Sequence, residues 1–109
     1  MSNFYDIFES VALRELIESI EDYHKSKLHE VEIYGDIFEN HTKFYIEFIL
    51  QNGDREEVCM KTINTYDNDQ EIFELFNEFA EQYRNILTDN YNIDCFILGC
   101  FYQFKTKED

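Results

Sequence analysis

Residues 43–63 read KFYIEFILQNGDREEVCMKTI, and this stretch determines how the chain folds. Apolar and polar side chains alternate in its first part, which predicts a strand from Lys43 to Leu50 with one buried face. An Asn-Gly pair, Asn52-Gly53, then indicates a hairpin turn. A second strand is predicted from Arg55 to Ile63.

The length of the loop sets the register of this hairpin. A three-residue loop ending at Gly53 places Ile46 opposite Val58. It also places Phe44 opposite Met60, so that apolar side chains meet on the buried face, whereas a two-residue loop sets phenylalanine opposite glutamate. A slip of one residue would move every side chain to the other face. We therefore predict the three-residue loop, with Gly53 in the left-handed position of a bulged turn.

A further strand lies on each side of the hairpin in the sequence. Residues 29–38 alternate valine and isoleucine with glutamate, which predicts a strand. Residues 93–105 form the last strand, and its apolar residues on both faces are typical of a central strand. Gly99 within it indicates a bulge or a close approach of backbones.

Two helices are predicted by apolar residues at steps of three and four. The first spans about 4–24, but its apolar stripe changes side halfway. It is either one helix whose first half is buried on both sides, or a helix from Val11 to Tyr23 after a break near Glu9–Ser10, with Ser10 as N-cap. The second helix follows a cap at Asp67 or Asn68 and ends near residues 88–90.

The order of elements is therefore helix, three strands, helix, strand. This order predicts one small α+β domain over residues 1–109, in which an antiparallel sheet of about four strands carries both helices on one face.

Acidic residues dominate the composition, with 24 Asp and Glu against nine Lys and Arg and a formal net charge of −15. Eleven Phe and eight Tyr distinguish the chain from a disordered acidic tail. Such a charge argues against direct binding to nucleic acid, whose phosphates would be repelled, and against anionic membranes. It favours a basic protein partner.

Three features bear on the compartment. The N-terminus lacks the basic and apolar regions of a signal peptide, and no stretch approaches the roughly 18 apolar residues of a membrane span. The cysteines are odd in number, namely Cys59, Cys95 and Cys100, which fits a reducing compartment. We expect a cytoplasmic protein of a bacterium, or of the host cell if a phage encodes it.

Catalytic and metal-binding motifs are missing from the sequence. It has no nucleophile elbow, P-loop or dinucleotide fingerprint, and its three histidines lack the spacing of a zinc site. Cys95 and Cys100 are five residues apart, so they point to opposite faces of a strand unless a bulge at Gly99 changes the parity. We therefore expect no enzymatic activity, no cofactor and no metal site.

The second helix carries an acidic stripe on one face. Like charges four residues apart destabilise an isolated helix by about 0.2–0.5 kcal/mol per pair, and no compensation is visible in the sequence. A local rule broken in this way favours a partner-binding surface over the alternative of a solvated helix face. The stripe consists of Asp67, Glu71, Glu74, Glu78 and Glu81. A second acidic face, on the first helix, consists of Glu15, Glu18, Glu21 and Asp22.

Successive acids of the stripe lie about 5–6 Å apart, a spacing comparable with that of phosphates along a nucleic-acid strand. This spacing suggests a non-enzymatic inhibitor that blocks the basic, nucleic-acid-handling surface of a nuclease. The inhibitor would be a toxin immunity protein or a phage-borne DNA mimic of the anti-CRISPR kind. The alternative is a structural or assembly subunit whose acidic face only keeps it soluble, which exposure of Tyr5, Tyr45 and Phe101 as one patch would favour.

Three parts of the chain carry a resemblance to a known family. They are the hairpin region 32–61, the acidic helix beginning Asp69-Gln70-Glu71-Ile72, and the last strand ending Phe101-Tyr102-Gln103-Phe104. In this order they resemble the bacterial immunity proteins that neutralise secreted nuclease toxins of Gram-positive cells. Those proteins often carry a tryptophan before the last strand, where this chain reads Asn90-Tyr91-Asn92-Ile93. The resemblance implies that this chain inhibits a nuclease toxin, and it assigns no binding residue here.

Overall fold

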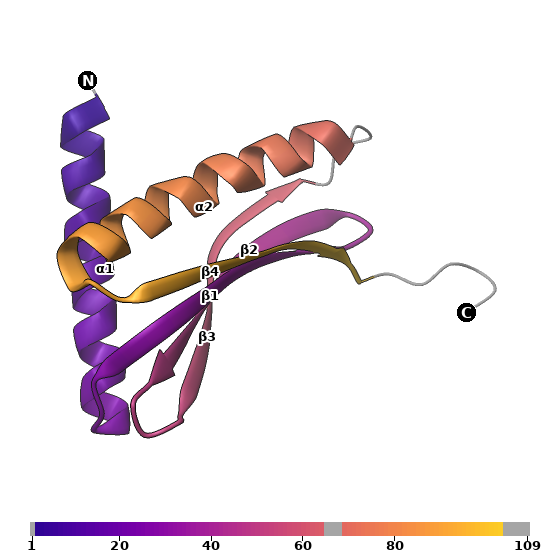
Figure 1. Cartoon of the computed structure of the whole chain (residues 1–109). Helices are drawn as coiled ribbons and strands as arrows, with labels where there is room; N and C mark the ends of the chain where they lie inside the picture. Colours follow the sequence, from indigo (N-terminus) through magenta and orange to yellow (C-terminus); the bar gives the residue numbers. More distant parts are fainter. Residues whose placement is uncertain (1, 65–68, 104–109) are drawn as a thin grey trace.

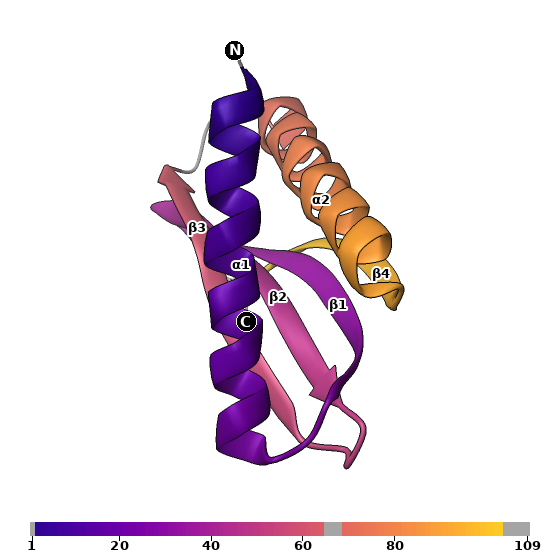
Figure 2. The same ribbon diagram turned by 90° about the vertical axis from the view of Figure 1, so that its left-hand side faces the viewer.

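The computed structural model describes residues 2–64 and 69–103, with side chains from residue 12 onward. Its elements follow each other in the predicted order, and both helices lie on one face of a four-stranded sheet whose other face is open (Figures 1 and 2). The α+β class is thereby confirmed. The elements are α1 (Ser2–His24), β1 (Leu28–Ile37), β2 (His41–Leu50), β3 (Arg55–Asn64), α2 (Asp69–Tyr91) and β4 (Asp94–Tyr102).

The sheet is mixed, with the strand order β3-β2-β1-β4. β2 pairs antiparallel with β1 and β3, whereas β4 pairs parallel with β1. The predicted antiparallel sheet and the predicted central place of the last strand are therefore wrong. The cause is α2, because a helix between two strands returns the chain to the end at which the first strand began. β4 consequently runs in the direction of β3 and β1, and it lies at the edge (Figure 1).

The first helix is continuous, without the break that was considered near Glu9–Ser10. Leu13, Ile17 and Ile20 are buried along its second half and join the core. The residue directly after the helix, Lys25, has the left-handed backbone conformation, with φ 54°. The next amide, that of Ser26, donates to the carbonyl of Glu21 at 3.2 Å, which is the hydrogen bond of a Schellman cap.

The second helix ends one residue beyond the predicted stop, at Tyr91. Asn92 has φ 53°, and its amide donates to the Thr88 carbonyl at 3.1 Å, which is the bond of an αL cap. The predicted N-caps Asp67 and Asn68 lie outside the described residues.

The hairpin between β2 and β3 has the predicted three-residue loop. The Gly53 amide donates to the Leu50 carbonyl at 2.9 Å, and Gly53 has φ 95° as predicted. Ile46 pairs with Val58, which confirms the register near the turn. Further along, Phe44 pairs with Lys61 instead of Met60, because a bulge in β3 shifts the register there.

A glycine in β1 allows two strands and a helix to pack together. A Cβ atom at Gly35 would lie 2.9 Å from Sγ of Cys100 and 3.0 Å from the ring of Phe44. The same phenylalanine packs against α2, with ring centroids 5.4 Å from Phe76 and 5.2 Å from Phe79. A side chain at position 35 would therefore push apart groups from β2 and β4.

We expect Gly35→Ala to lower the free energy of unfolding by about 1–3 kcal/mol, which is the usual cost of overpacking a core. Urea unfolding followed by circular dichroism measures this change. Adding Cys100→Ala should restore part of the loss, because it removes the nearer of the two crowding atoms. A Gly35→Ala variant as stable as the wild type would contradict this packing.

Candidate functional site

The acidic stripe of α2 lies on the solvent side of the helix. Glu71, Glu74, Glu78 and Glu81 are all exposed. The opposite side of α2 is buried against the sheet, and its buried residues are Ile72, Phe76, Phe79, Ala80, Tyr83 and Leu87. The stripe is thus held on a helix whose rotation is fixed by its core face. The fifth predicted member, Asp67, lies outside the described residues.

Two members of the stripe already have partners on the same helix. Nη2 of Arg84 lies 2.8 Å and 3.0 Å from the two carboxylate oxygens of Glu81. The side-chain amide of Gln70 lies 3.4 Å from Glu74. Within the described residues, Glu71 and Glu78 make no hydrogen bond or ion pair. The stripe is therefore only partly neutralised by its own helix.

The acidic face of α1 is divided between surface and structure. Glu15, Glu18 and Asp22 are exposed, as expected for a charged face. Glu21 instead accepts a hydrogen bond of 2.8 Å from the backbone amide of Leu28, where the chain enters β1. Its other oxygen lies 3.9 Å from Nζ of Lys27. Glu21 thus helps to join α1 to the sheet.

A third acidic surface, on the open face of the sheet, was not identified from the sequence. Glu32, Glu47 and Glu57 stand side by side across β1, β2 and β3. Like charges directly opposite each other on neighbouring strands are destabilising. Arg55 offsets part of this repulsion, because its Nη1 lies 3.5 Å from Glu32 and 3.5 Å from Glu47. The alternation of side chains in each strand, combined with the predicted register of the hairpin, could have predicted that Glu47 and Glu57 lie opposite each other.

Tyrosines lie beside this row of glutamates. The rings of Tyr34 and Tyr45 stack with their centroids 5.4 Å apart, and the Tyr34 hydroxyl donates a hydrogen bond to Glu57. Tyr45 is half-buried and Phe101 is exposed, while the side chain of Tyr5 is not described. The patch of Tyr5, Tyr45 and Phe101 that would favour an assembly subunit therefore stays a prediction, because one of its three side chains lies outside the described ones.

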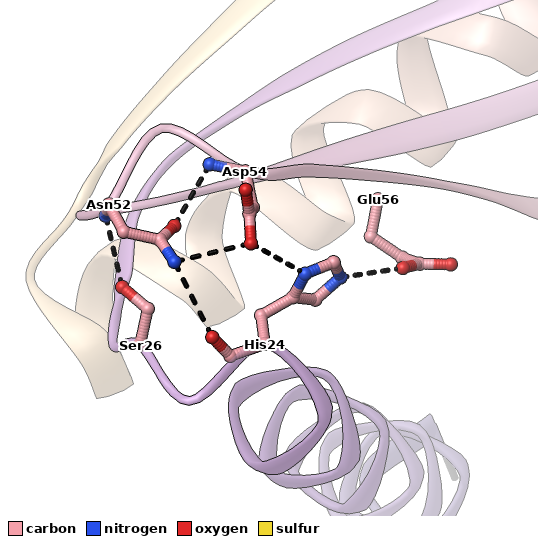
Figure 3. A network of polar contacts seen from close by, with 5 residues as sticks. All are labelled: His24, Ser26, Asn52, Asp54 and Glu56. Atoms are coloured by element: carbon pink, nitrogen blue, oxygen red, sulfur yellow. Dashed lines mark hydrogen bonds and ion pairs between the residues drawn. The ribbon is translucent and has the colours of Figure 1, made fainter.

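A histidine connects the end of α1 to the hairpin between β2 and β3 (Figure 3). Nδ1 of His24 lies 3.0 Å from Asp54, and Nε2 lies 2.8 Å from Glu56. Asn52 extends the network, since its side chain donates to Asp54 at 3.2 Å and its backbone amide donates to the hydroxyl of Ser26 at 3.0 Å. Hydrogen bonds to Glu56 and Asp54 raise the pKa of His24 above its usual value of 6.5. This network was not identified from the sequence.

Two of the three thiols face the core. A bulge in β4 around Gly99, which has φ 113°, places Cys95 beside Val31 and Cys100 beside Gly35. Both are half-buried and pack against the core. The bulge therefore brings the two cysteines to the same face of β4, which was the alternative considered from the sequence. Burial raises the pKa of the Cys100 thiol to about 11, which keeps it protonated and unreactive at neutral pH.

No group of three or more His, Cys, Asp and Glu side chains in the described parts of the chain could hold a metal ion. No helix in these parts is long and apolar enough to cross a membrane. Comparisons with protein-family models, with curated proteins and with solved structures find no match to this chain. Functional inference therefore depends on the surfaces described above.

The His24 network predicts a pH-dependent stability. The folded pKa of His24 lies above the unfolded one, so its contribution is complete below about pH 6.5 and is lost as the pH rises through the folded pKa. We expect the urea midpoint of the wild type to fall between about pH 6 and pH 8.5, and this fall to be smaller in His24→Ala. His29→Ala is the control, because the His29 side chain is 61 % exposed and faces one carboxylate, that of Glu30 at 3.6 Å, whereas His24 is held between two. Equal falls in the wild type and His24→Ala would refute the assignment.

Proposed function

We propose that this protein is a non-enzymatic acidic inhibitor that covers the basic, nucleic-acid-handling surface of a partner nuclease. The observation that carries the proposal is the row of exposed carboxylates on α2, fixed in position by a buried face of the same helix. Neighbouring acids at steps of three and four residues lie about 5–6 Å apart. A rigid line of charges with this spacing suits a groove that normally holds phosphates.

Electrostatics favours a protein partner over nucleic acid. A formal charge of −15 repels phosphates and attracts a surface rich in Lys and Arg. Arginines that reach the stripe would find Glu71 and Glu78 available, while Glu81 would have to leave Arg84. Two biological roles share this physics, namely a toxin immunity protein and a phage-borne DNA mimic of the anti-CRISPR kind. Both require a cytoplasmic protein without turnover of its own.

A second candidate function is that of an assembly subunit. It is favoured by five large apolar side chains that are exposed on β4, since exposed apolar surface concentrated on one element often marks a protein contact. The two candidates use different faces, because the stripe lies on the solvent side of α2 and the apolar patch lies at the edge of the sheet.

The proposal predicts the effect of neutralising the stripe by changing Glu71, Glu74, Glu78 and Glu81 together to Gln. Stability should change little, because relief of about 0.2–0.5 kcal/mol per like-charge pair is offset by loss of the Glu81–Arg84 pair. Association with the partner should be slower, and its salt dependence should be shallower. The partner is first captured from source-cell extract at low salt and purified, and stopped-flow mixing then gives the rates.

A charge-matched control separates the stripe from net charge. Changing Glu15, Glu18 and Glu39 to Gln and Asp22 to Asn removes four other exposed charges. This control should bind at nearly the wild-type rate, and duplex DNA should compete with both proteins for the partner. Association that is unchanged in the stripe variant at low salt, or a partner that handles no nucleic acid, would overturn the proposal.

A further inference from the structure

The two edges of the sheet differ in their protection against pairing with another chain. β3, at one edge, carries four charged residues, namely Arg55, Glu56, Glu57 and Lys61. β4, at the other edge, has only Asp94 at its first position, and the chain contains no proline. Charged residues and prolines are the usual means of keeping an edge strand from pairing. The β3 edge has such charges along its length, whereas the protection of β4 is the bulge at Gly99, which β3 matches with a bulge of its own.

β4 also carries most of the exposed apolar surface. Seven large apolar side chains are exposed among the described residues, and five of them are on this strand, with exposed fractions of 37–50 %. They are Phe96, Ile97, Leu98, Phe101 and Tyr102. Register with β1 places Phe96 and Phe101 on the open face of the sheet, and Ile97 and Tyr102 on the helix face. A strand that is apolar on both faces is normally flanked by two neighbours, yet β4 pairs only with β1 in the described structure.

The distribution of acidic residues limits which surfaces of two copies of this chain can meet. Two copies that met through α2, through α1 or through the open face of β1 would bring acidic groups together. β4 reduces this repulsion, because its own acid, Asp94, lies at one end, and Asp69 of α2, which accepts a hydrogen bond from the Tyr102 hydroxyl, lies at the other. In an antiparallel pair of two β4 strands, the two Asp94 residues lie at opposite ends of the ladder. Between these two ends, residues 95–101 carry no charge, so an apolar strand of the same chain can pair there without placing charged side chains against each other.

We propose that two copies of this chain associate through antiparallel pairing of their β4 strands about a two-fold axis. The contact is isologous, as in most homodimers, and it joins two four-stranded sheets into one of eight strands. β4 then becomes central, in agreement with its sequence. The proposal does not rest on the proposed function, since it uses the edge of β4 and none of the carboxylates of the α2 stripe.

Salt distinguishes this dimer from a complex held by charge. Two chains of charge −15 repel each other, so screening by salt should tighten the dimer, whereas it would weaken binding to a basic partner. Sedimentation velocity of the full chain alone, over a range of concentrations at about 50 mM and about 500 mM NaCl, measures this difference. The expected result is a monomer–dimer equilibrium with more dimer at the higher salt.

A matched pair of variants locates the contact. Phe101 and Thr62 belong to one cross-strand row, through Asp36 and Lys43, and stand at opposite edges of the sheet. Phe101→Lys should raise the dissociation constant of the dimer at least about tenfold, because it removes an apolar ring from the pairing edge and a lysine on an edge strand opposes pairing with another chain. Thr62→Lys adds the same charge to the same face at the other edge, and should leave the dimer as tight as before.

Three results would overturn the proposal. They are a monomer at every concentration at high salt, a dimer that salt dissociates, and a dimer that Thr62→Lys weakens as much as Phe101→Lys does. Circular dichroism and thermal unfolding check that the variants fold, and Leu98→Lys replaces Phe101→Lys if that variant does not. The stripe variant of α2 should dimerise at least as tightly as the wild type, because it lowers the like charge of both copies, so a failure of the dimer and a failure of partner binding are separate outcomes.

Discussion

The lack of a side chain at Gly35 is the constraint on which the packing of this protein depends. It lets Phe44 of β2 and Cys100 of β4 approach the middle of β1 from its two sides. Phe44 in turn supports the aromatic residues of α2, and Phe79 continues the contact to Tyr83 with ring centroids 5.1 Å apart. Because this packing fixes which side of α2 faces the sheet, it also fixes which side presents the acids. A backbone feature of β1 thus determines the direction of a charged surface on another element.

Two basic side chains of the described residues lie where they bridge pairs of carboxylates within the fold. His24 bridges Asp54 and Glu56 at the end of α1, and Arg55 bridges two glutamates on the open face. Most of the stripe on α2 has no such support, although Arg84 holds one end of it. Repulsion is therefore reduced within the framework of the fold and retained among the exposed acids of the helices, the α2 stripe included. This distribution is what a surface selected for a basic partner would require, and it is the physical basis of the proposed inhibitor.

Local pattern was sufficient for the order of elements, for the turn at Gly53 and for the exposure of the stripe, because each depends on periodicity or on one residue's backbone freedom. It failed where distant parts of the chain meet. The apolar faces of β4 predicted a central strand, but the crossover by α2 set its direction and place. The partners of His24 are 30 and 32 residues away, so no local signal indicates them. The bulge that shifts Phe44 to Lys61 likewise depends on how β3 fits against β2.

The parallel pairing of β1 with β4 also has a consequence for how the protein is made. Glu30 pairs with Asp94, so the ladder joins segments that are far apart in the sequence, whereas β1, β2 and β3 form by short connections. Long-range pairings of this kind form late, since the chain must first lose the entropy of closing a large loop. During synthesis on a ribosome, the side of β1 that pairs with β4 therefore stays without a partner strand until β4 emerges. The nascent chain is most vulnerable to misassembly and to chaperone capture in that interval.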